Sequence, residues 1–252
     1  MVLPLFKTHY SLGKSILTLQ EKNASLIKGP DSIVDICLEN EIKEFYLVED
    51  NMGSFLQAYN STKEEKLSFI FGLRLNVCRD RTERGEAVLQ GTSKYVFFAR
   101  NEEGYKKLIK IYSDAASTGF YYEPRTDFGF LRKIWNDKHL ALAIPFYDSF
   151  LFKNTLEDGE CMPELDFTSP TFLIEDNGLP FDIIMRRRVE KFCEDKYETQ
   201  EAKSIYYKNK DDFMAYLTMR CISNRSTWSK PNFDHLSSDE FSFESWRELN
   251  HA

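Results

Sequence analysis

Histidine and cysteine are scarce in this chain of 252 residues, which has four of the first and five of the second. The cysteines are scattered, odd in number and without a Cys-X-X-Cys pair, which favours reduced thiols in a cytoplasmic protein over a disulfide framework. No apolar run approaches the roughly 18 residues of a membrane-spanning helix. The first residues also lack the basic flank and cleavage site of a signal peptide. We therefore expect neither a secreted nor a membrane protein.

An excess of positive charge is also missing, because 33 Lys and Arg residues face 40 Asp and Glu residues, giving a formal net charge of −7. Sequence-independent binding to nucleic acid needs a basic face, so the balance argues against it and leaves only a local basic groove open. Neither of the glycine-rich phosphate-binding motifs, GxxxxGK[ST] and GxGxxG, is present. Apolar residues make up 42% of the chain and aromatic residues 15%, which is enough to fill a large core.

Short apolar runs rich in aromatic and β-branched residues alternate with segments of helical period. Strands are expected at residues 2–8, 45–49, 67–77, 94–99, 140–145 and 171–175, and helices at 30–40, 54–59, 101–115, 180–197 and 211–223. The charged segment 79–93 is expected to be an exposed loop in a hairpin excursion. This alternation predicts an α/β fold with a parallel sheet covered on both faces, open or closed into a barrel. We expect the barrel to span 1–223 and a C-terminal segment, 224–252, to pack on it or dock to a partner.

Several motifs follow the expected strands, at the positions where α/β folds carry their active residues. They are Leu47-Val-Glu-Asp-Asn-Met-Gly53, Phe97-Phe-Ala-Arg-Asn-Glu-Glu-Gly-Tyr105, Gly119-Phe-Tyr-Tyr-Glu-Pro-Arg-Thr-Asp127 and Ile174-Glu-Asp-Asn-Gly-Leu-Pro180, with weaker ones at 8–12, 69–75, 207–212 and 243–249. In order and spacing they resemble the PHP (polymerase and histidinol phosphatase) domain that begins the bacterial DNA polymerase III α subunit. The resemblance spans essentially the whole chain and implies a distorted (β/α)7 barrel.

Active members of that family bind a cluster of divalent metal ions through His, Asp, Glu and sometimes Cys, and use it to activate water against a phosphoester. In this chain the matching positions hold Lys7 or Leu5, Glu49, Asp50, Arg74, Lys94, Phe146, Asn177, Ser204 and Tyr206. A cation at Arg74 or Lys94 repels a metal ion and offers no lone pair. We therefore predict a vestigial cleft with no catalytic residue, no metal and no cofactor, formed by His9, Glu49, Asp50, Arg74, Lys94, Asp176 and Asn177.

The carboxylates of this cleft leave two interpretations open. Glu49, Asp50 and Asp176 could hold a single Mg or Mn ion through water. The favoured interpretation is that they pair with Arg74 and Lys94, because a vacated metal site must rebalance its buried carboxylates.

Three other features have a structural and a functional interpretation. His9 is expected to be a hydrogen-bonded residue at the barrel rim. The basic run at 186–188 is expected to pair with helix carboxylates instead of a phosphate backbone. The aromatic residues 120–122 beside Arg125 are the one cluster that could stack on bases.

The leading hypothesis is a catalytically degenerate PHP domain that serves as a scaffold or interaction module in DNA replication, for instance in a phage or mobile element carrying the domain alone. Its partners would be replication proteins, with weak nucleic-acid binding at most and no membrane contact. One alternative is a metal-dependent phosphoesterase or 3′–5′ exonuclease with a reduced site of His9, Glu49, Asp50 and Asp176. Another is a decoy that binds host replication proteins.

Overall fold

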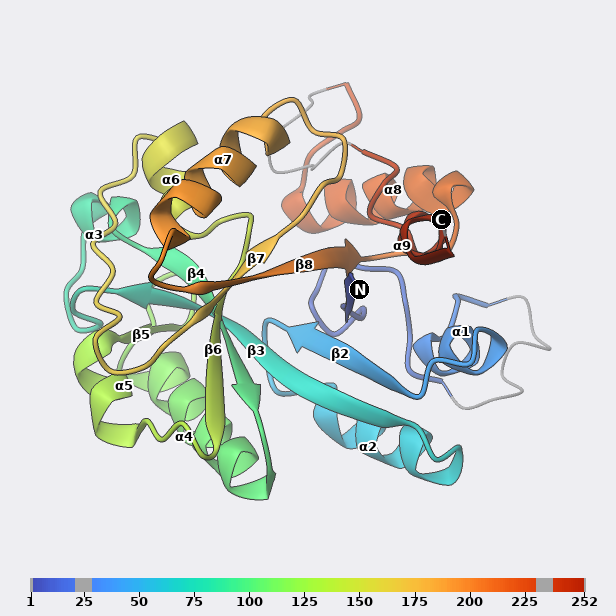
Figure 1. Ribbon diagram of the computed structural model, residues 1–252, viewed down its shortest axis with the longest axis horizontal. Helices are drawn as coiled ribbons and strands as arrows, with labels where there is room; N and C mark the ends of the chain where they lie inside the picture. Colours follow the sequence, from blue (N-terminus) through green and yellow to red (C-terminus); the bar gives the residue numbers. More distant parts are fainter. Residues whose placement is uncertain (1, 21–28, 230–237, 252) are drawn as a thin grey trace.

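A closed barrel lies at the centre of the protein (Figure 1), in a computed structural model that describes residues 2–20, 29–229 and 238–251. Within these residues seven strands form the ring in the order β2–β1–β8–β7–β6–β4–β3, and β3 pairs with β2 to close it. The ring strands are β1 (Leu3–Phe6), β2 (Glu44–Glu49), β3 (Ser68–Cys78), β4 (Ser93–Ala99), β6 (Leu140–Ile144), β7 (Thr171–Ile174) and β8 (Glu198–Ile205). Strand β5 (Arg125–Asp127) pairs with the end of β3 outside the ring. The prediction of a distorted (β/α)7 barrel is confirmed.

Strand β4 differs from the sequence prediction in its direction. It runs antiparallel to both of its neighbours, β3 and β6, whereas the other pairs in the ring are parallel. The expectation of a purely parallel sheet is therefore wrong at this strand. An antiparallel pair needs no crossover helix packed on the sheet, and the segment between β3 and β4 returns as a hairpin excursion that contains the short, exposed helix α3 (Glu86–Gln90).

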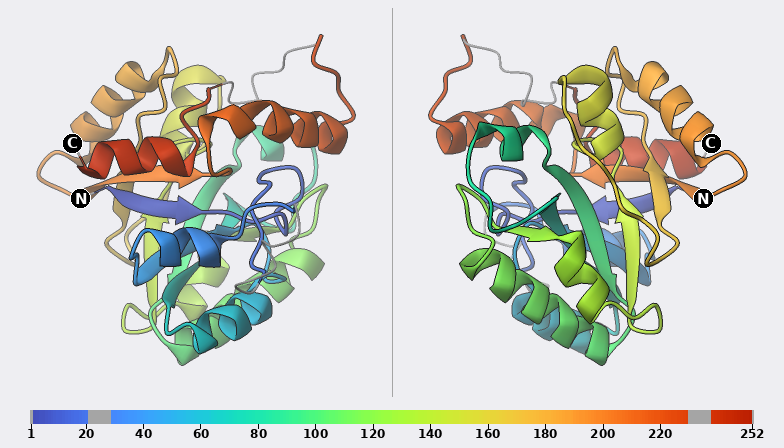
Figure 2. Two further views of the ribbon diagram at one scale, coloured as in Figure 1. Left: turned by 90° about the vertical axis from the view of Figure 1, so that its right-hand side faces the viewer. Right: turned by 90° about the vertical axis from the view of Figure 1, so that its left-hand side faces the viewer.

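Helices cover the outside of the barrel (Figures 1 and 2). They are α1 (Ile33–Glu39), α2 (Phe55–Glu64), α4 (Glu102–Ser117), α5 (Phe128–Ile134), α6 (Phe150–Leu156), α7 (Asp182–Cys193), α8 (Phe213–Asn224) and α9 (Phe243–His251). Ser32 caps α1 by accepting a hydrogen bond from the backbone of Val34, and Asn101 caps α4 in the same way. No helix of the described ranges is long and apolar enough to cross a membrane.

Two apolar clusters follow from the alternation of side chains along the strands. The larger cluster lies between the strands and the helices and contains most of the buried phenylalanines. The smaller one draws on alternate residues of the ring strands and fills the barrel interior; its buried members are Leu5, Val48, Val96, Phe98, Ala143, Leu173 and Ala202. All five cysteines are free and buried.

The C-terminal helix α9 lies beside the first strand. The indole Nε1 of Trp246 donates a hydrogen bond to the carbonyl of Val2 at 2.9 Å, and the ring of Phe243 stacks on that of Phe6. Both Phe243 and Trp246 are buried. The two ends of the chain therefore stabilise each other through packing and one indole hydrogen bond.

Candidate functional site

A pocket of about 800 Å³ opens at the end of the barrel where the parallel strands finish. Its floor is part of the interior apolar cluster, with Leu5, Val48, Val96 and Leu173 among the lining residues. Loops after the strands and helix α8 supply the wall. The pocket therefore occupies the place where folds of this class carry their active residues.

Strand alternation decides which side chains reach the pocket from below. A residue two positions beyond a floor residue points to the same side of the sheet. Directly after β1 and β7 these residues are Lys7 and Glu175, and on β3 the residue two beyond Gly72 is Arg74. Because β4 runs the other way, it presents Lys94, two residues before its floor residue. The layer above the apolar floor therefore consists largely of charged side chains.

Asp50, which follows β2, is held between two lysines. Its Oδ1 lies 3.0 Å from Lys7 Nζ and its Oδ2 lies 2.9 Å from Lys14 Nζ. Burial opposes ionisation of Asp50, but the neighbouring lysine charges outweigh it and hold the pKa of that carboxyl well below its usual value. Burial lowers the pKa of Lys7 to about 8, in spite of the favourable charge of Asp50. Asp50 is thus a counter-ion to two ammonium groups.

Arg74 and Lys94 have carboxylate partners from loops. Arg74 Nη2 lies 2.6 Å from Asp148 Oδ2, and Lys94 Nζ lies 3.0 Å from Glu123 Oε2. Burial acts against the charge of Asp148, but Arg74 reverses the effect and lowers its pKa. The pKa of Glu123 is lowered chiefly by Lys94. We expected Arg74 and Lys94 to form ion pairs with Glu49, Asp50 and Asp176, and this is wrong, because their partners are Asp148 and Glu123. The charges of Arg74 and Lys94 still lower the pKa of Asp50 at longer range.

Glu49 serves the structure of the barrel mouth. Its Oε1 accepts hydrogen bonds from the backbone and hydroxyl of Thr8, and its Oε2 accepts one from the hydroxyl of Ser11. The side chain is fully buried, and burial raises the pKa of the carboxyl although Lys7 and these donors partly offset the effect. Glu49 therefore fastens the loop after β1 to the end of β2 and does not line the pocket.

Three other residues of the predicted cleft also stay out of the pocket lining. His9 is exposed at the rim, with its Nδ1 3.3 Å from the carbonyl of Leu17, as expected for a hydrogen-bonded rim residue. Asp176 is exposed, and its carboxylate accepts a hydrogen bond from the backbone of Gly178. Asn177 is buried, and its amide donates to the hydroxyl of Tyr147 and to Glu175. Of the seven residues predicted to form the cleft, only Arg74 and Lys94 line the pocket. Asp50 does not line it but contacts the lining residue Lys7.

The prediction missed several pocket residues, of which Glu175 is the most instructive. Its carboxylate accepts hydrogen bonds from the backbone and hydroxyl of Ser204 and from the Asn177 amide, and burial raises its pKa. It stands two residues after Leu173, so alternation from a known inward residue would have selected Glu175 over Asp176. Lys14, Glu123 and Asp148 come from loops, where no periodicity indicates direction.

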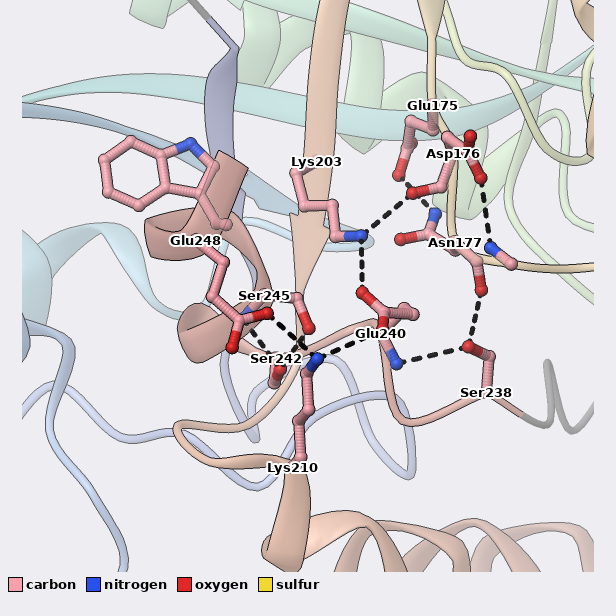
Figure 3. Close-up of polar contacts among 12 residues, drawn as sticks. Glu175, Asp176, Asn177, Lys203, Lys210, Ser238, Glu240, Ser242, Ser245 and Glu248 are labelled. Carbon is pink, nitrogen blue, oxygen red and sulfur yellow. Dashed lines mark hydrogen bonds and ion pairs between the residues drawn. The ribbon is translucent and has the colours of Figure 1, made fainter. Parts of the chain in front are cut away.

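A network behind the pocket ties the loop after β7 to the C-terminal segment (Figure 3). The buried ammonium group of Lys203 donates to the carbonyl of Asp176 at 2.8 Å and lies 3.4 Å from Glu240 Oε2. Lys210 Nζ binds the other Glu240 oxygen at 3.2 Å, and Ser238 donates to the carbonyl of Asn177. The segment after α8 thereby helps to position the wall of the pocket.

The side chains at the barrel mouth do not fit the metal cluster that the family resemblance implies. Among the residues that the structure describes, no group of three or more His, Cys, Asp and Glu side chains is placed to hold a metal ion. The two oxygens of Asp50 face ammonium groups, and those of Glu49 face hydroxyl and amide donors. A multinuclear centre needs several free imidazole or carboxylate ligands around one point, and this arrangement does not provide them.

Comparison with known proteins identifies the family. A family model described as PHP domain matches residues 23–156. DNA polymerase III subunit alpha of Treponema pallidum (strain Nichols) is 26% identical over 202 residues, which cover 76% of this chain and 17% of that protein. The protein of the same name from Borreliella burgdorferi is 24% identical over 211 residues, covering 79% of this chain and 18% of that protein. The chain spans less than a fifth of the length of these two relatives. With a family match over more than half of its residues and a closed mixed barrel of the expected kind, the chain belongs to the PHP domain family.

Proposed function

We propose that this chain is a catalytically degenerate PHP domain, a pseudoenzyme that acts as a scaffold or interaction module in DNA replication. The observation that carries the proposal is the arrangement of Lys7, Asp50 and Lys14 at the barrel mouth. An active member of the family would present metal ligands there, whereas here both oxygens of the aspartate face ammonium groups.

The ammonium groups at Asp50 oppose metal binding by electrostatic repulsion. Two like unit charges about 4 Å apart in a partly buried site repel by about 4 kcal/mol, and the figure doubles for a divalent ion beside one ammonium group. Lys7 and Lys14 both contact Asp50, so a metal ion at this carboxylate would meet two such repulsions. Protonated side chains at these positions supply the positive charge that a metal ion would otherwise bring to the site.

The link to replication rests on the two relatives, which are named as subunits of DNA polymerase III. In this proposal the partners are replication proteins, and the chain contributes a folded surface instead of a reaction. Helix α8 offers large apolar side chains to such a partner, because Met214, Met219 and Ile222 are all exposed on it. A phage or mobile element is the setting we favour.

Activity assays test the loss of catalysis. The purified chain is incubated with Mn²⁺, Zn²⁺ or Mg²⁺ and either a 3′-labelled single strand or a chromogenic phosphoester. The expected result is no turnover above that of Asp50→Ala and Glu49→Ala variants prepared in the same way. Turnover by the wild type that either substitution abolishes would contradict the proposal and establish a metal-dependent phosphoesterase or exonuclease.

A pull-down tests the scaffold role. The tagged chain is mixed with the replication proteins of its own source and, separately, with those of a cellular host. Capture of the first set is expected, and a Met219→Glu, Ile222→Glu double variant should lose it while keeping its thermal unfolding midpoint. Capture of host proteins only would overturn the scaffold in favour of a decoy.

A further inference from the structure

Helix α8 exposes a face that carries no charge. Arg220 is the only charged residue of this fully described helix and is buried, whereas Met214, Met219 and Ile222 are between 40% and 69% exposed. A helix at a protein surface ordinarily turns charged side chains toward water, as α4 does with two glutamates and two lysines at its exposed positions. An uncharged, apolar helix face of this kind marks a surface that another molecule covers.

The loop that follows β1 extends this face. Gly13 has a φ of 70° and lies so close to α8 that a Cβ atom on it would stand 2.2 Å from Ser223 Cβ. Leu12 and Ile222, which precede these two residues in the chain, are 81% and 69% exposed beside that contact. Figure 2 shows α8 at the edge of the molecule with the loop directly beneath it. Leu12, Ile222 and Met219, which lies one turn earlier on α8, therefore form one exposed apolar patch, which we call the α8 patch.

The α8 patch borders the pocket at the barrel mouth, whose lining is positively charged. Lys14 follows Gly13 and lines the pocket, as does Asn224 at the end of α8. Lys and Arg side chains outnumber Asp and Glu side chains among the lining residues by seven to four, or by seven to five when the adjacent Asp50 is included, although the whole chain carries a formal charge of −7. Lys14 and Lys153 reach solvent, with side chains that are 38% and 26% exposed. A concave site with such an excess attracts groups of the opposite charge.

Two kinds of partner fit this combination poorly. A nucleic-acid backbone is charged throughout, and binding it would leave the α8 patch against phosphates. A second copy packed through α8 about a two-fold axis would bring two positively charged mouths together. A protein segment with apolar side chains beside acidic ones suits both parts of the surface. Because the exposed residues Ala215, Met219 and Ile222 stand three to four positions apart, they form a ridge along α8 that suits packing against another helix.

We propose that the α8 patch and the barrel mouth together bind an acidic amphipathic helix of a partner protein. Apolar side chains of that helix cover Leu12, Met219 and Ile222, and its carboxylates face Lys14 and Lys153 at the mouth. The proposal rests on the interaction role given above and specifies the chemistry of the partner. Burial of the α8 patch supplies most of the affinity, because exposed ion pairs contribute little each. The cations select an acidic partner and orient it on the surface.

Fluorescence anisotropy of the full chain with four labelled peptides tests the surface. Each peptide has about 15 residues, because a shorter isolated helix is only marginally stable in water. The first carries leucines along one face and glutamates beside them. The second has glutamine and the third has lysine in place of every glutamate, and the fourth has the composition of the first in shuffled order.

We expect saturable binding of the glutamate peptide and no binding of the lysine peptide. The glutamine and shuffled peptides should bind more weakly than the glutamate peptide by about 5-fold or more at about 0.05 M salt. The gap between the glutamate and glutamine peptides should narrow at about 0.5 M salt, because salt screens exposed charges.

Serine variants measure the apolar contribution. Leu12→Ser and Ile222→Ser should each weaken binding of the glutamate peptide by about 10- to 100-fold, the loss expected when one large apolar side chain is no longer buried. Both residues are exposed in the free chain, so the unfolding midpoint should stay unchanged. Ile183→Ser is the matched control, because Ile183 is 66% exposed on a different helix, α7, and its replacement should have no effect on binding.

Glutamine variants measure the charged contribution. Lys14→Gln and Lys153→Gln should each weaken binding of the glutamate peptide by about 2- to 5-fold at about 0.05 M salt. Lys191→Gln removes the same charge from an exposed position on α7 and should have no effect. Because Lys14 also contacts Asp50, circular dichroism checks the folding of Lys14→Gln, and Lys153→Gln provides the second measurement if that variant unfolds.

Several results would overturn the proposal. Three of them are no saturable binding of the glutamate peptide, equal affinity for the glutamate and glutamine peptides at low salt, and equal losses in Ile222→Ser and Ile183→Ser. Self-association of the chain that Ile222→Ser abolishes would make a second copy the occupant instead. Saturable binding of a labelled single strand that Ile222→Ser weakens as much would assign the surface to nucleic acid.

The pull-down described above separates this proposal from the replication role. Capture of the replication proteins without peptide binding would overturn the acidic helix and keep the scaffold. Peptide binding without such capture would support the proposed surface and contradict the link to replication.

Discussion

Replacing Asp50 by asparagine should destabilise the protein in a way that depends on pH. The substitution keeps the size of the side chain and leaves Lys7, whose side chain is 4% exposed, without its counter-ion. Removing one partner of a buried ion pair costs about 3–5 kcal/mol. The share of the loss that depends on the charge of Lys7 has an upper bound, because Lys7 can release its proton. With a pKa of about 8 in the folded wild type, this release costs about 1.4 kcal/mol at pH 7.

The pH dependence follows from the lowered pKa of Lys7. Burial lowers it from 10.5 to about 8, so between these values the unfolded chain binds more protons than the folded one, and the stability of the wild type rises with pH. At pH 9.5 Lys7 is largely neutral in the folded wild type, as it is in the variant. The difference between wild type and Asp50→Asn, about 3–5 kcal/mol at pH 7, should therefore be smaller by about 1.4 kcal/mol at pH 9.5.

Urea denaturation followed by circular dichroism at both pH values measures this difference. Glu103→Gln is a matched control, because it removes one carboxylate of an exposed pair with Lys106 and should leave the free energy of unfolding nearly unchanged at either pH. A loss for Asp50→Asn that is equal at the two pH values, or no greater than that of the control, would refute the assignment of Lys7 as its buried partner.

Three further substitutions test the packing around the pocket by their free energies of unfolding in urea. Gly72→Ala would place a Cβ atom 2.5 Å from Phe98 Cε1 in the barrel interior; we expect a loss of about 1–3 kcal/mol, and recovery when Phe98 is also changed to Leu would confirm the clash. Trp246→Ala should cost about 3–5 kcal/mol, because a buried indole and its bond to Val2 are both lost; a loss below about 1 kcal/mol would show that α9 is dispensable. Lys203→Ala should cost about 1–3 kcal/mol and speed proteolysis of the C-terminal segment; unchanged cleavage would contradict its role in fastening that segment.

The sequence predicted the barrel well where strands are apolar and less well elsewhere. Six expected strands match β1, β2, β3, β4, β6 and β7, since each carries a run of large apolar or aromatic residues. Strand β8 (Glu198–Ile205) was not predicted, because its exposed half is polar and its inward residues, Ala202 and Ser204, are small. Strand β5 has three residues, all polar, and only its pairing with β3 makes it a strand. The helices α5 and α6 were also not predicted, although α1, which has the same length of seven residues, was.

The site was harder to predict than the fold, because its residues depend on the direction and register of the strands and on the course of the loops. Arg74 and Lys94, which the motifs select, both line the pocket, since each lies on the inward side of its strand. Their partners could not be inferred, because Asp148 and Glu123 come from loops whose course depends on tertiary packing. Asp148 has a φ of 60°, a conformation that aspartate tolerates, and no local pattern indicates it. The sequence thus revealed the change of charge at the mouth but not the pairs that compensate it.

The ion pairs at the barrel mouth also predict how the protein responds to a chelator. A barrel mouth that buries carboxylates needs positive charge nearby, and a metal-binding domain obtains it from its ions, so chelation destabilises such a domain. Here Lys7, Lys14 and Arg74 provide the charge covalently. We therefore expect the thermal unfolding midpoint to be the same before and after dialysis against EDTA, with Asp50→Asn lower than wild type in both conditions. A fall of several degrees in EDTA that Mn²⁺ or Zn²⁺ reverses would show that the carboxylates still depend on a bound cation, and the interpretation of the lysines as their counter-ions would be wrong.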